Sequence, residues 1–169
     1  MSGPLEGFRI LDLSQIVSGP FASLLLSDQG ANVVKVEPVH GQDVTRRQNF
    51  ARGGLSAFYM NGNRGKRSIS VDLTVDDGRQ LLLDLASTTD VFIQNFRPGA
   101  CDRLGIGYDA IYTVHPAVVY LSVSGFGQDP ASPYRDMGAY ASVVEAMSGI
   151  YEFKRAPGWS PIANPVGAL

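Results

Sequence analysis

The residues of this sequence best suited to binding a ligand are two arginines and the phenylalanine beside one of them. In "NFRPG", which begins at Asn95, Arg97 carries a guanidinium that can pair with two phosphate oxygens, and Phe96 carries a ring that can pack on a flat group. Arg103 lies about two helical turns further on and can face the same crevice. Alone, Arg97 is equally consistent with an exposed loop side chain, and a single helix arginine such as Arg103 is more often a solvated surface residue. Together these side chains favour an anionic ligand with an aromatic part.

A second candidate site is the turn "VSGPFAS", in which Val17 and Ser18 precede a predicted helix. The first N–H groups of a helix have no partner inside the helix, so they can bind an anion. The same turn is also an ordinary connection between a strand and a helix. From the residues alone, the ligand is nucleotide-like, and nothing finer follows.

The elements that must position these residues alternate between strands and helices. Apolar runs bounded by turn residues predict strands at residues 8–14, 32–38, 67–73, 90–96 and 117–125. Helical patterns fall at residues 19–30, 74–88, 108–116 and 139–150. The alternation predicts an α/β fold, a Rossmann-like parallel sheet with flanking helices. Ligands of such sheets bind beyond the carboxyl ends of the strands.

Local signals mark where these helices begin and end. Pro20 suits a first helical turn, and Gly30 suits the end of the same helix. Thr74 is expected to cap the next helix, with Asp76 and Asp77 placing negative charge at its positive end. The polar stretch at residues 39–54 is expected to be a long surface loop.

Composition narrows the class of protein. The chain has 169 residues, is 44% hydrophobic and 18% charged, and has a net charge of -2, which argues against nucleic acid as a partner. Its apolar runs are too short to span a membrane, and its start does not resemble a signal peptide. Cys101 is the single cysteine and His40 and His115 are the two histidines, so no metal site is expected. A cytoplasmic location is expected.

Three common ligand and catalytic motifs are absent. "LGIGYD" follows a helix and lacks the third glycine of a dinucleotide fingerprint, and "GNRGKRS" lacks the first glycine and the hydroxyl residue of a Walker loop. No serine has the G-x-S-x-G setting of a hydrolase.

Several long stretches resemble the family III CoA-transferases, the group that contains formyl-CoA transferase, carnitine CoA-transferase and the α-methylacyl-CoA racemases. The matching stretches keep the family's order and run from near Pro4 to the end of the chain: "PLEGFRILDLSQIVSGPFASLLLSDQGANVVKVEP", "GQDVTR", "NGNRGKRSISVDL", "DVFIQNFRPGACDRLGIGYDAI", "HPAVVYLSVSGFGQ" and "SPYRD".

The resemblance implies that coenzyme A binds at the carboxyl end of the sheet. The implied contacts are Val17 and Ser18 in the first turn, Val71, Asp72, Leu73 and Thr74 beside the adenosine, Asn95, Phe96, Arg97 and Arg103 at the phosphates and pantetheine, and Tyr140 near the thioester. Many family members carry a cation at the positions of Pro38, Thr74 and a residue near Gly138. The absence of these cations implies that the phosphates of CoA are bound more weakly or by a different arrangement of residues.

The resemblance also implies that the chain is the N-terminal part of a longer protein. The family's nucleophile is an Asp in a stretch like G-A-L-G-D, and "VGAL" matches its start, so the Asp is expected two residues beyond Leu169. Residues 1–169 are then an incomplete N-terminal CoA-binding α/β domain, without the second domain and the C-terminal return segment. Alone, the chain is expected to be inactive, whereas the parent forms an interlocked homodimer.

The implied reaction is transfer of CoA from an acyl-CoA to a carboxylic acid through a covalent Asp intermediate. One alternative is an α-methylacyl-CoA racemase or epimerase, but that chemistry needs two bases. The family's racemases place His and Asp where this chain has Tyr140 and Ala141, and neither tyrosine nor alanine is a base suited to neutral pH. The other alternative is a non-catalytic CoA-binding module.

Overall fold

A five-stranded parallel sheet forms the centre of the chain's first unit. The computed structural model describes residues 3–40, 43–48, 51–152 and 156–160, and the chain divides into two units, Met1–Val123 and Ser124–Leu169. The strands of the first unit are β1 (Arg9–Asp12), β2 (Asn32–Glu37), β3 (Arg67–Ser70), β4 (Val91–Gln94) and β5 (Val119–Ser122). Their spatial order is β3-β2-β1-β4-β5, and every neighbouring pair is parallel. The predicted Rossmann-like α/β fold is confirmed.

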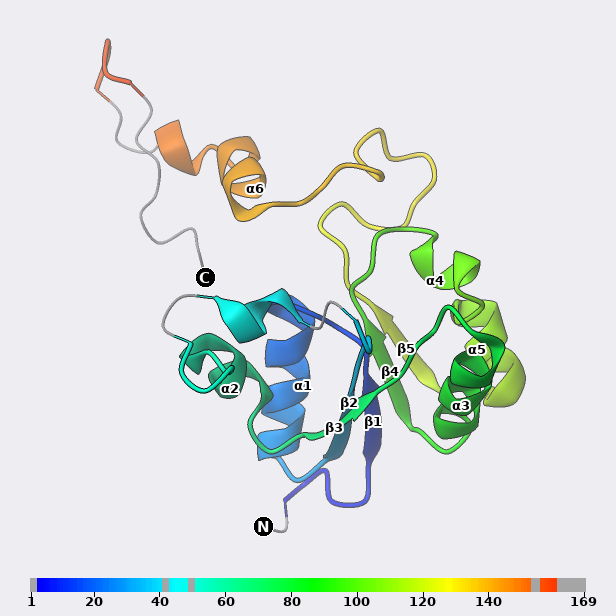
Figure 1. The fold of residues 1–169 in the computed structure, drawn as a ribbon. Coiled ribbons are helices and arrows are strands. Elements are labelled where there is room, and N and C mark those ends of the chain that lie inside the picture. The colour runs from blue at the N-terminus through cyan, green and yellow to red at the C-terminus, as the bar shows by residue number, and fades with distance from the viewer. Residues whose placement is uncertain (1–2, 41–42, 49–50, 153–155, 161–169) are drawn as a thin grey trace. The chain divides into compact units, whose positions relative to one another are not determined.

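Helices cover both faces of this sheet (Figure 1). On one face lie α1 (Ser18–Asp28) and α2 (Ala57–Asn63), and on the other lie α3 (Asp76–Ala86) and α5 (Tyr108–Val114). The short helix α4 (Ala100–Arg103) lies between β4 and α5 in sequence. Strand order reverses at β1, because β2 and β4 flank it on opposite sides. In open α/β sheets such a switch point opens a crevice at the carboxyl ends of the strands.

Burial follows from this layered arrangement. The larger core cluster includes Leu11, Phe92, Leu82 and Ile111, which join β1 and β4 to α3 and α5. The smaller cluster on the α1 face includes Ile10, Ala31, Val33 and Ile93. The central strands are nearly continuously buried, as expected when both faces are covered. The edge strands are more exposed: β5 alternates between exposed and half-buried residues, and in β3 all residues but Ile69 are exposed.

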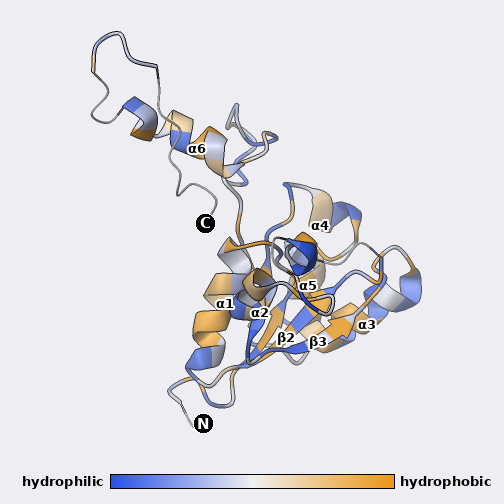
Figure 2. Cartoon of the chain, turned by 60° about the vertical axis from the view of Figure 1, so that its left-hand side comes forward, coloured by the Kyte–Doolittle hydropathy of each residue, from blue (hydrophilic) through white to orange (hydrophobic). Residues whose placement is uncertain are grey.

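Helix α1 begins and ends where glycine is needed. A Cβ atom at Gly19 would collide with the Ser14 side chain, so only glycine lets the first turn of α1 approach the end of β1 this closely. Gly30 follows the C-cap of α1 with φ of +100°, a conformation that favours glycine. Apolar residues make up much of α1 (orange in Figure 2), and among them Phe21 is 54% exposed and Leu25 46% exposed.

Two local expectations were wrong. Thr74 does not cap α3, because Val75 is the N-cap and the Thr74 hydroxyl donates to Asp72 instead. The predicted negative charge in the first turn of α3 is present at Asp76 and Asp77. Residues 39–54 are not simply a surface loop: within the described part, η1 (Val44–Arg47) is a 3-10 helix whose Thr45 is fully buried.

The second unit contains two short helices, α6 (Ala141–Met147) and η2 (Ile150–Glu152). Tyr140 precedes α6 as its N-cap residue and is 68% exposed. A Cβ atom at Gly138 would meet the Tyr140 ring at 2.8 Å, so the glycine leaves space for that ring. The stretch "VGAL" lies outside the described residues.

Candidate functional site

A pocket of about 320 Å³ lies where the first four strands reach their carboxyl ends. Most of its wall is apolar, and its polar groups come from a few residues, an arrangement typical of small-molecule sites. The lining residues are Leu13, Gln15, Val36, Glu37, Pro38, Val39, His40, Val71, Asp72, Leu73, Thr74, Phe96 and Leu104. A pocket of this composition can hold a flat ring against Phe96 and the branched side chains around it.

The residues that follow β3 form one wall of the pocket. Asp72 Oδ1 accepts hydrogen bonds from the Thr74 backbone N–H at 2.9 Å and from the Thr74 hydroxyl at 2.6 Å. These bonds lower the pKa of Asp72 below its usual range, so the wall carries a negative charge at neutral pH. A Cβ atom at Gly78 would collide with the Asp72 carbonyl, so the start of α3 packs directly on this wall.

Glu37, at the end of β2, brings a second carboxylate to the pocket. Its oxygens accept from Arg46 Nε at 2.7 Å, Arg46 Nη2 at 2.6 Å and the Tyr59 hydroxyl at 2.5 Å. Burial alone would raise the pKa of Glu37, but the bonds from Arg46 and Tyr59 outweigh burial and lower it to about 2. Burial, followed by the hydrogen bond to Glu37, raises the pKa of Tyr59, and the charge of Arg46 opposes this shift. Glu37 is therefore a charged group whose charge is already balanced.

Asn95 and Gln15 join the ends of β4 and β1 at the switch point of the sheet. The Gln15 N–H donates to Asn95 Oδ1 at 2.8 Å, and Asn95 Nδ2 donates to the Gln15 carbonyl at 2.7 Å. Gln15 lines the pocket, whereas Asn95 does not. Asn95 was predicted as a ligand contact, but in this structure its side-chain amide bonds to the neighbouring turn.

The N-terminus of α1 has N–H groups that no side chain caps. Val17 is its N-cap residue and provides no capping oxygen, and its first turn holds no acidic residue. Ser18 is the first residue of the helix and is exposed. The turn therefore retains the feature that suits an anion, free donors at the positive end of a helix of 11 residues.

Arg97 and Arg103 are both exposed and are both next to pocket residues in the chain. Arg97 follows Phe96, and Arg103 precedes Leu104. Within the described ranges, neither guanidinium has an ion-pair or hydrogen-bond partner. Arg103 Nη1 lies 3.1 Å from where a Cβ atom of Gly99 would stand, so its side chain lies over the loop that follows β4.

The sequence-predicted residues thus fall into three groups. Those that line the pocket are Val71, Asp72, Leu73, Thr74 and Phe96. Those that lie in the same unit without lining the pocket are Val17, Ser18, Asn95, Arg97 and Arg103. Tyr140 belongs to the second unit.

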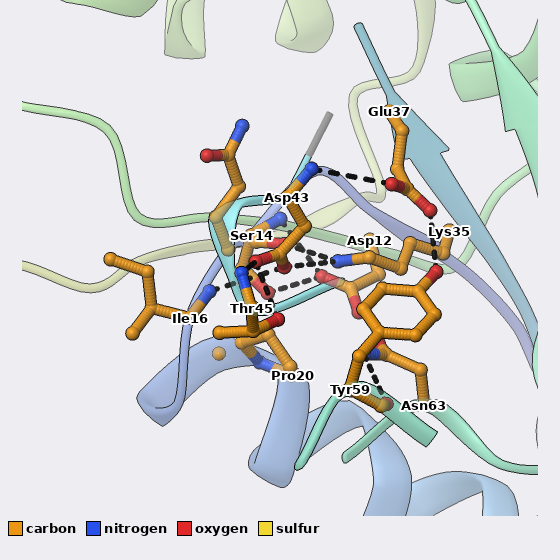
Figure 3. Close-up of polar contacts among 12 residues, drawn as sticks. Asp12, Ser14, Ile16, Pro20, Lys35, Glu37, Asp43, Thr45, Tyr59 and Asn63 are labelled. Atoms are coloured by element: carbon orange, nitrogen blue, oxygen red, sulfur yellow. Dashed lines mark hydrogen bonds and ion pairs between the residues drawn. The ribbon is translucent and has the colours of Figure 1, made fainter. Parts of the chain in front are cut away.

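Sequence reasoning missed a buried layer of charges beneath this site (Figure 3). Lys66 Nζ pairs with Asp12 at 3.1 Å, and Lys35 Nζ pairs with Asp43 at 3.3 Å, and each of these four side chains is at most 1% exposed. Burial lowers the pKa of Lys66, and the attraction of Asp12 opposes that shift. A signal was available, because Asp12 and Lys35 interrupt apolar strand runs, and charges inside such runs require partners.

Within the described part of the chain, no group of three or more His, Cys, Asp and Glu side chains could hold a metal ion. No helix in the same part is both long and apolar enough to cross a membrane.

A family model described as "CoA-transferase family III" matches residues 5–168. The chain belongs to CoA-transferase family III. It is 39% identical to the acetyl-CoA:oxalate CoA-transferase of Acetobacter aceti over 148 residues, and the aligned region covers 88% of this chain and 38% of that protein. It is 36% identical to the human succinyl-CoA:glutarate CoA-transferase over 160 residues, and the aligned region covers 94% of this chain and 36% of that protein.

Two solved structures share the fold of this chain. A CAIB/BAIF family protein from Brucella suis matches with a TM-score of 0.89 at 32% identity, over 99% of this chain and 45% of that one. The hypothetical protein Rv3272 from Mycobacterium tuberculosis matches with a TM-score of 0.88 at 35% identity, over 98% of this chain and 46% of that one. The chain therefore spans less than half the length of the family III relatives that it matches.

Proposed function

We propose that this chain is the CoA-binding part of an enzyme that transfers CoA from an acyl-CoA to a carboxylic acid. The observation that carries the proposal is the apolar pocket at the carboxyl ends of β1 to β4, together with Arg97 and Arg103, which are next to pocket residues in the sequence. Within the described ranges, neither arginine has an ion-pair or hydrogen-bond partner. Relatives named for CoA transfer involving oxalate, glutarate and citramalate support the reaction class.

In this proposal the parts of CoA divide among the residues of the site. The adenosine packs against Phe96 and the wall formed by Val71, Asp72, Leu73 and Thr74. The phosphates bind Arg97, Arg103 and the N–H groups at Val17 and Ser18, since each of these offers a positive or hydrogen-donating group without a competing partner. Tyr140 lies near the thioester, and Asn95 supports the turn that the pantetheine passes.

The grip on the phosphates then depends mainly on two side chains. Pro38 and Thr74 line the pocket at positions where many family members carry a cation, and the pocket itself contains the carboxylates of Glu37 and Asp72. Of these, Glu37 is balanced by Arg46, while the side chain of Asp72, within the described residues, accepts hydrogen bonds from the neutral Thr74 alone. Removing Arg97 or Arg103 should therefore have a larger effect here than in a relative with further cations.

The proposed chemistry uses an Asp that follows "VGAL" in the longer protein. Its carboxylate attacks the acyl-CoA carbonyl, forms a mixed anhydride and releases the CoA thiolate. The thiolate attacks the aspartyl carbonyl, which gives an aspartyl-CoA thioester and frees the first acid. The acceptor carboxylate then displaces the thiolate, and the thiolate attacks the acceptor's carbonyl in the new anhydride, regenerating the Asp. The covalent intermediates divide one difficult transfer of CoA into several easier steps.

Two other functions are less favoured. A racemase needs two bases at the positions of Tyr140 and Ala141, and Ala141, the first residue of α6, has no titratable group. A CoA-binding module without catalysis remains the second alternative, and the coding sequence after Leu169 separates it from the enzyme: a G-D pair and a second domain are expected there, and a stop codon would favour the module.

The first test of this proposal is a calorimetric titration of the 169-residue chain with CoA. Binding is expected, and transfer from an acyl-CoA to a carboxylic acid, followed by mass spectrometry, is expected to be absent. With the longer protein, transfer should appear, and a 2-methylacyl-CoA in deuterated water should gain no deuterium at its 2-carbon. Catalytic deuterium uptake would replace the transferase assignment with the racemase.

We further propose that the longer protein is a cytoplasmic, interlocked homodimer. This follows from the resemblance of the matched stretches, and light scattering on the longer protein tests it. A monomeric mass at micromolar concentration would contradict the homodimer.

A further inference from the structure

Ile16, in the turn between β1 and α1, has an unusual backbone conformation. Its φ is +70°, and no other non-glycine residue in the described part of the chain has a positive φ. A branched Cβ makes this region unfavourable for isoleucine. Such residues persist where the surrounding structure holds them, often next to a ligand site. The Ile16 side chain is 50% exposed, so burial of that side chain is not what holds it.

Asp43 provides a direct hold on this turn, although it lies in another segment of the chain. The Ile16 N–H donates to Asp43 Oδ2 at 3.2 Å (Figure 3). The same oxygen pairs with Lys35 Nζ at 3.3 Å, and Lys35 in turn donates to the Ser14 carbonyl at 2.7 Å. One buried carboxylate and one buried ammonium thus bind both ends of the three-residue turn.

The other oxygen of Asp43 is occupied by its own segment. Asp43 Oδ1 accepts from the Thr45 N–H at 3.0 Å and from the Thr45 hydroxyl at 2.7 Å. Asp43 is 1% exposed, so it cannot reach a ligand in the pocket. Any effect of Asp43 on binding must therefore pass through the residues that it holds.

We propose that Asp43 is a positioning residue that holds Ile16 in its left-handed conformation and thereby aims the N-terminus of α1 at the phosphates of CoA. This inference rests on the proposed function, because Val17 and Ser18 directly follow Ile16 and begin that helix. The Asp43 carboxylate contributes orientation to the donors of the turn, and its partner Lys35 supplies the charge that makes burial of the carboxylate possible.

The test uses the whole 169-residue chain, with a substitution of Asp43 and a control substitution of Thr45. Asp43→Asn removes the charge and weakens the hold on Ile16. Thr45→Val is the matched control, because it removes a bond to Oδ1 and leaves both contacts of Oδ2 in place. Asp43→Glu, which keeps a charge for Lys35, is the second variant if Asp43→Asn does not fold.

Two quantities are measured: hydrogen exchange of the Ile16 amide without ligand, by NMR, and the Kd for CoA, by calorimetry. Asp43→Asn or Asp43→Glu is expected to speed exchange of the Ile16 amide and to raise the Kd, each by roughly tenfold or more. Thr45→Val is expected to lower Tm while leaving both quantities within about twofold of the wild type. If the wild type binds CoA and the Asp43 variants bind it with the same Kd, the positioning role of Asp43 is overturned and the proposed function is not. If the wild type does not bind CoA, the proposed function is overturned.

Discussion

The side chain of Asn95 makes two hydrogen bonds to the backbone of Gln15, from 80 residues away in the sequence. An amide group is suited to this contact, because it has one acceptor for the N–H and one donor for the carbonyl. The pair connects the ends of β1 and β4, the two neighbouring strands at which the strand order reverses. It therefore holds the turn after β1, which includes the pocket residue Gln15, against the end of β4.

Replacing Asn95 by Asp should damage this connection more than its small change in shape suggests. The carboxylate keeps an acceptor for the Gln15 N–H but turns a second acceptor toward the Gln15 carbonyl. We expect the free energy of unfolding to fall by about 1–3 kcal/mol, together with weaker CoA binding. Denaturant unfolding and calorimetry measure both. Gln29→Ala is the control: it removes an exposed amide whose one hydrogen bond within the described residues is to the Leu25 carbonyl, so it should leave stability and CoA binding nearly unchanged.

Arg97→Ala and Arg103→Ala should each weaken CoA binding by roughly tenfold or more, because a charge-assisted contact to phosphate contributes about 1.5–3 kcal/mol. The difference in CoA affinity between wild type and each variant should become smaller as the salt concentration rises, because salt screens the attraction between arginine and phosphate. Calorimetric titrations at low and high salt measure both effects. Arg9→Ala removes the same charge at the opposite end of β1, and it should have little effect. Equal affinities for the Arg97 and Arg9 variants would remove Arg97 from the site.

The pair of Glu37 and Arg46 should make stability depend on pH in the acid range. The pKa of Glu37 is lowered to about 2 in the folded chain, so its ionised form is stabilised by folding. This contribution is complete above the usual glutamate pKa of about 4.5 and is lost as the pH falls toward 2, in total on the order of 3 kcal/mol.

The measurement for this pair is denaturant unfolding between those two pH values. Wild type should lose stability more steeply than Glu37→Gln, which is less stable at neutral pH because it leaves Arg46 without a carboxylate. Parallel curves for the two proteins would show that Glu37 titrates normally.

Cys101 should be unreactive in the folded chain. It is 6% exposed, and burial raises the pKa of its thiol to about 11, so little thiolate forms at pH 8. Mass spectrometry after treatment with iodoacetamide should find modification only after denaturation. Ser87→Cys provides an exposed thiol at the end of α3 as a positive control. Equal labelling of Cys101 and the added cysteine would contradict the burial.

The sequence allowed the positions of the strands along the chain to be predicted because the central strands are buried on both faces. Runs such as those of β1, β2 and β4 are apolar for that reason, and Gly30 marks a helix end by its conformation. Several strands, central ones included, were predicted too long: β1 was expected at residues 8–14 and spans Arg9–Asp12, and β5 was expected at residues 117–125 and spans Val119–Ser122. A strand ends where its hydrogen bonds to a neighbouring strand end, not where its apolar residues end.

The site was predicted only as far as single segments could show it. Phe96 and the residues after β3 were expected at the ligand and do line the pocket. Asp43 and Lys35 could not be paired from sequence, because their contact depends on how residues 43–45 fold back over β1 and β2. The polarity of residues 39–54 indicated exposure, whereas Asp43 and Thr45 are polar because they hydrogen-bond in a buried place.

The contact between Asn95 and Gln15 also sets an order of events when the chain folds. The turn after β1 is made early in the chain, but the amide that holds Gln15 arrives only when β4 docks beside β1. Closing a loop of that length is slow and entropically costly compared with local contacts. A nascent chain that has completed only β1 to β3 can therefore have its first helix without a finished crevice, so competence to bind a ligand is acquired late, together with the fourth strand.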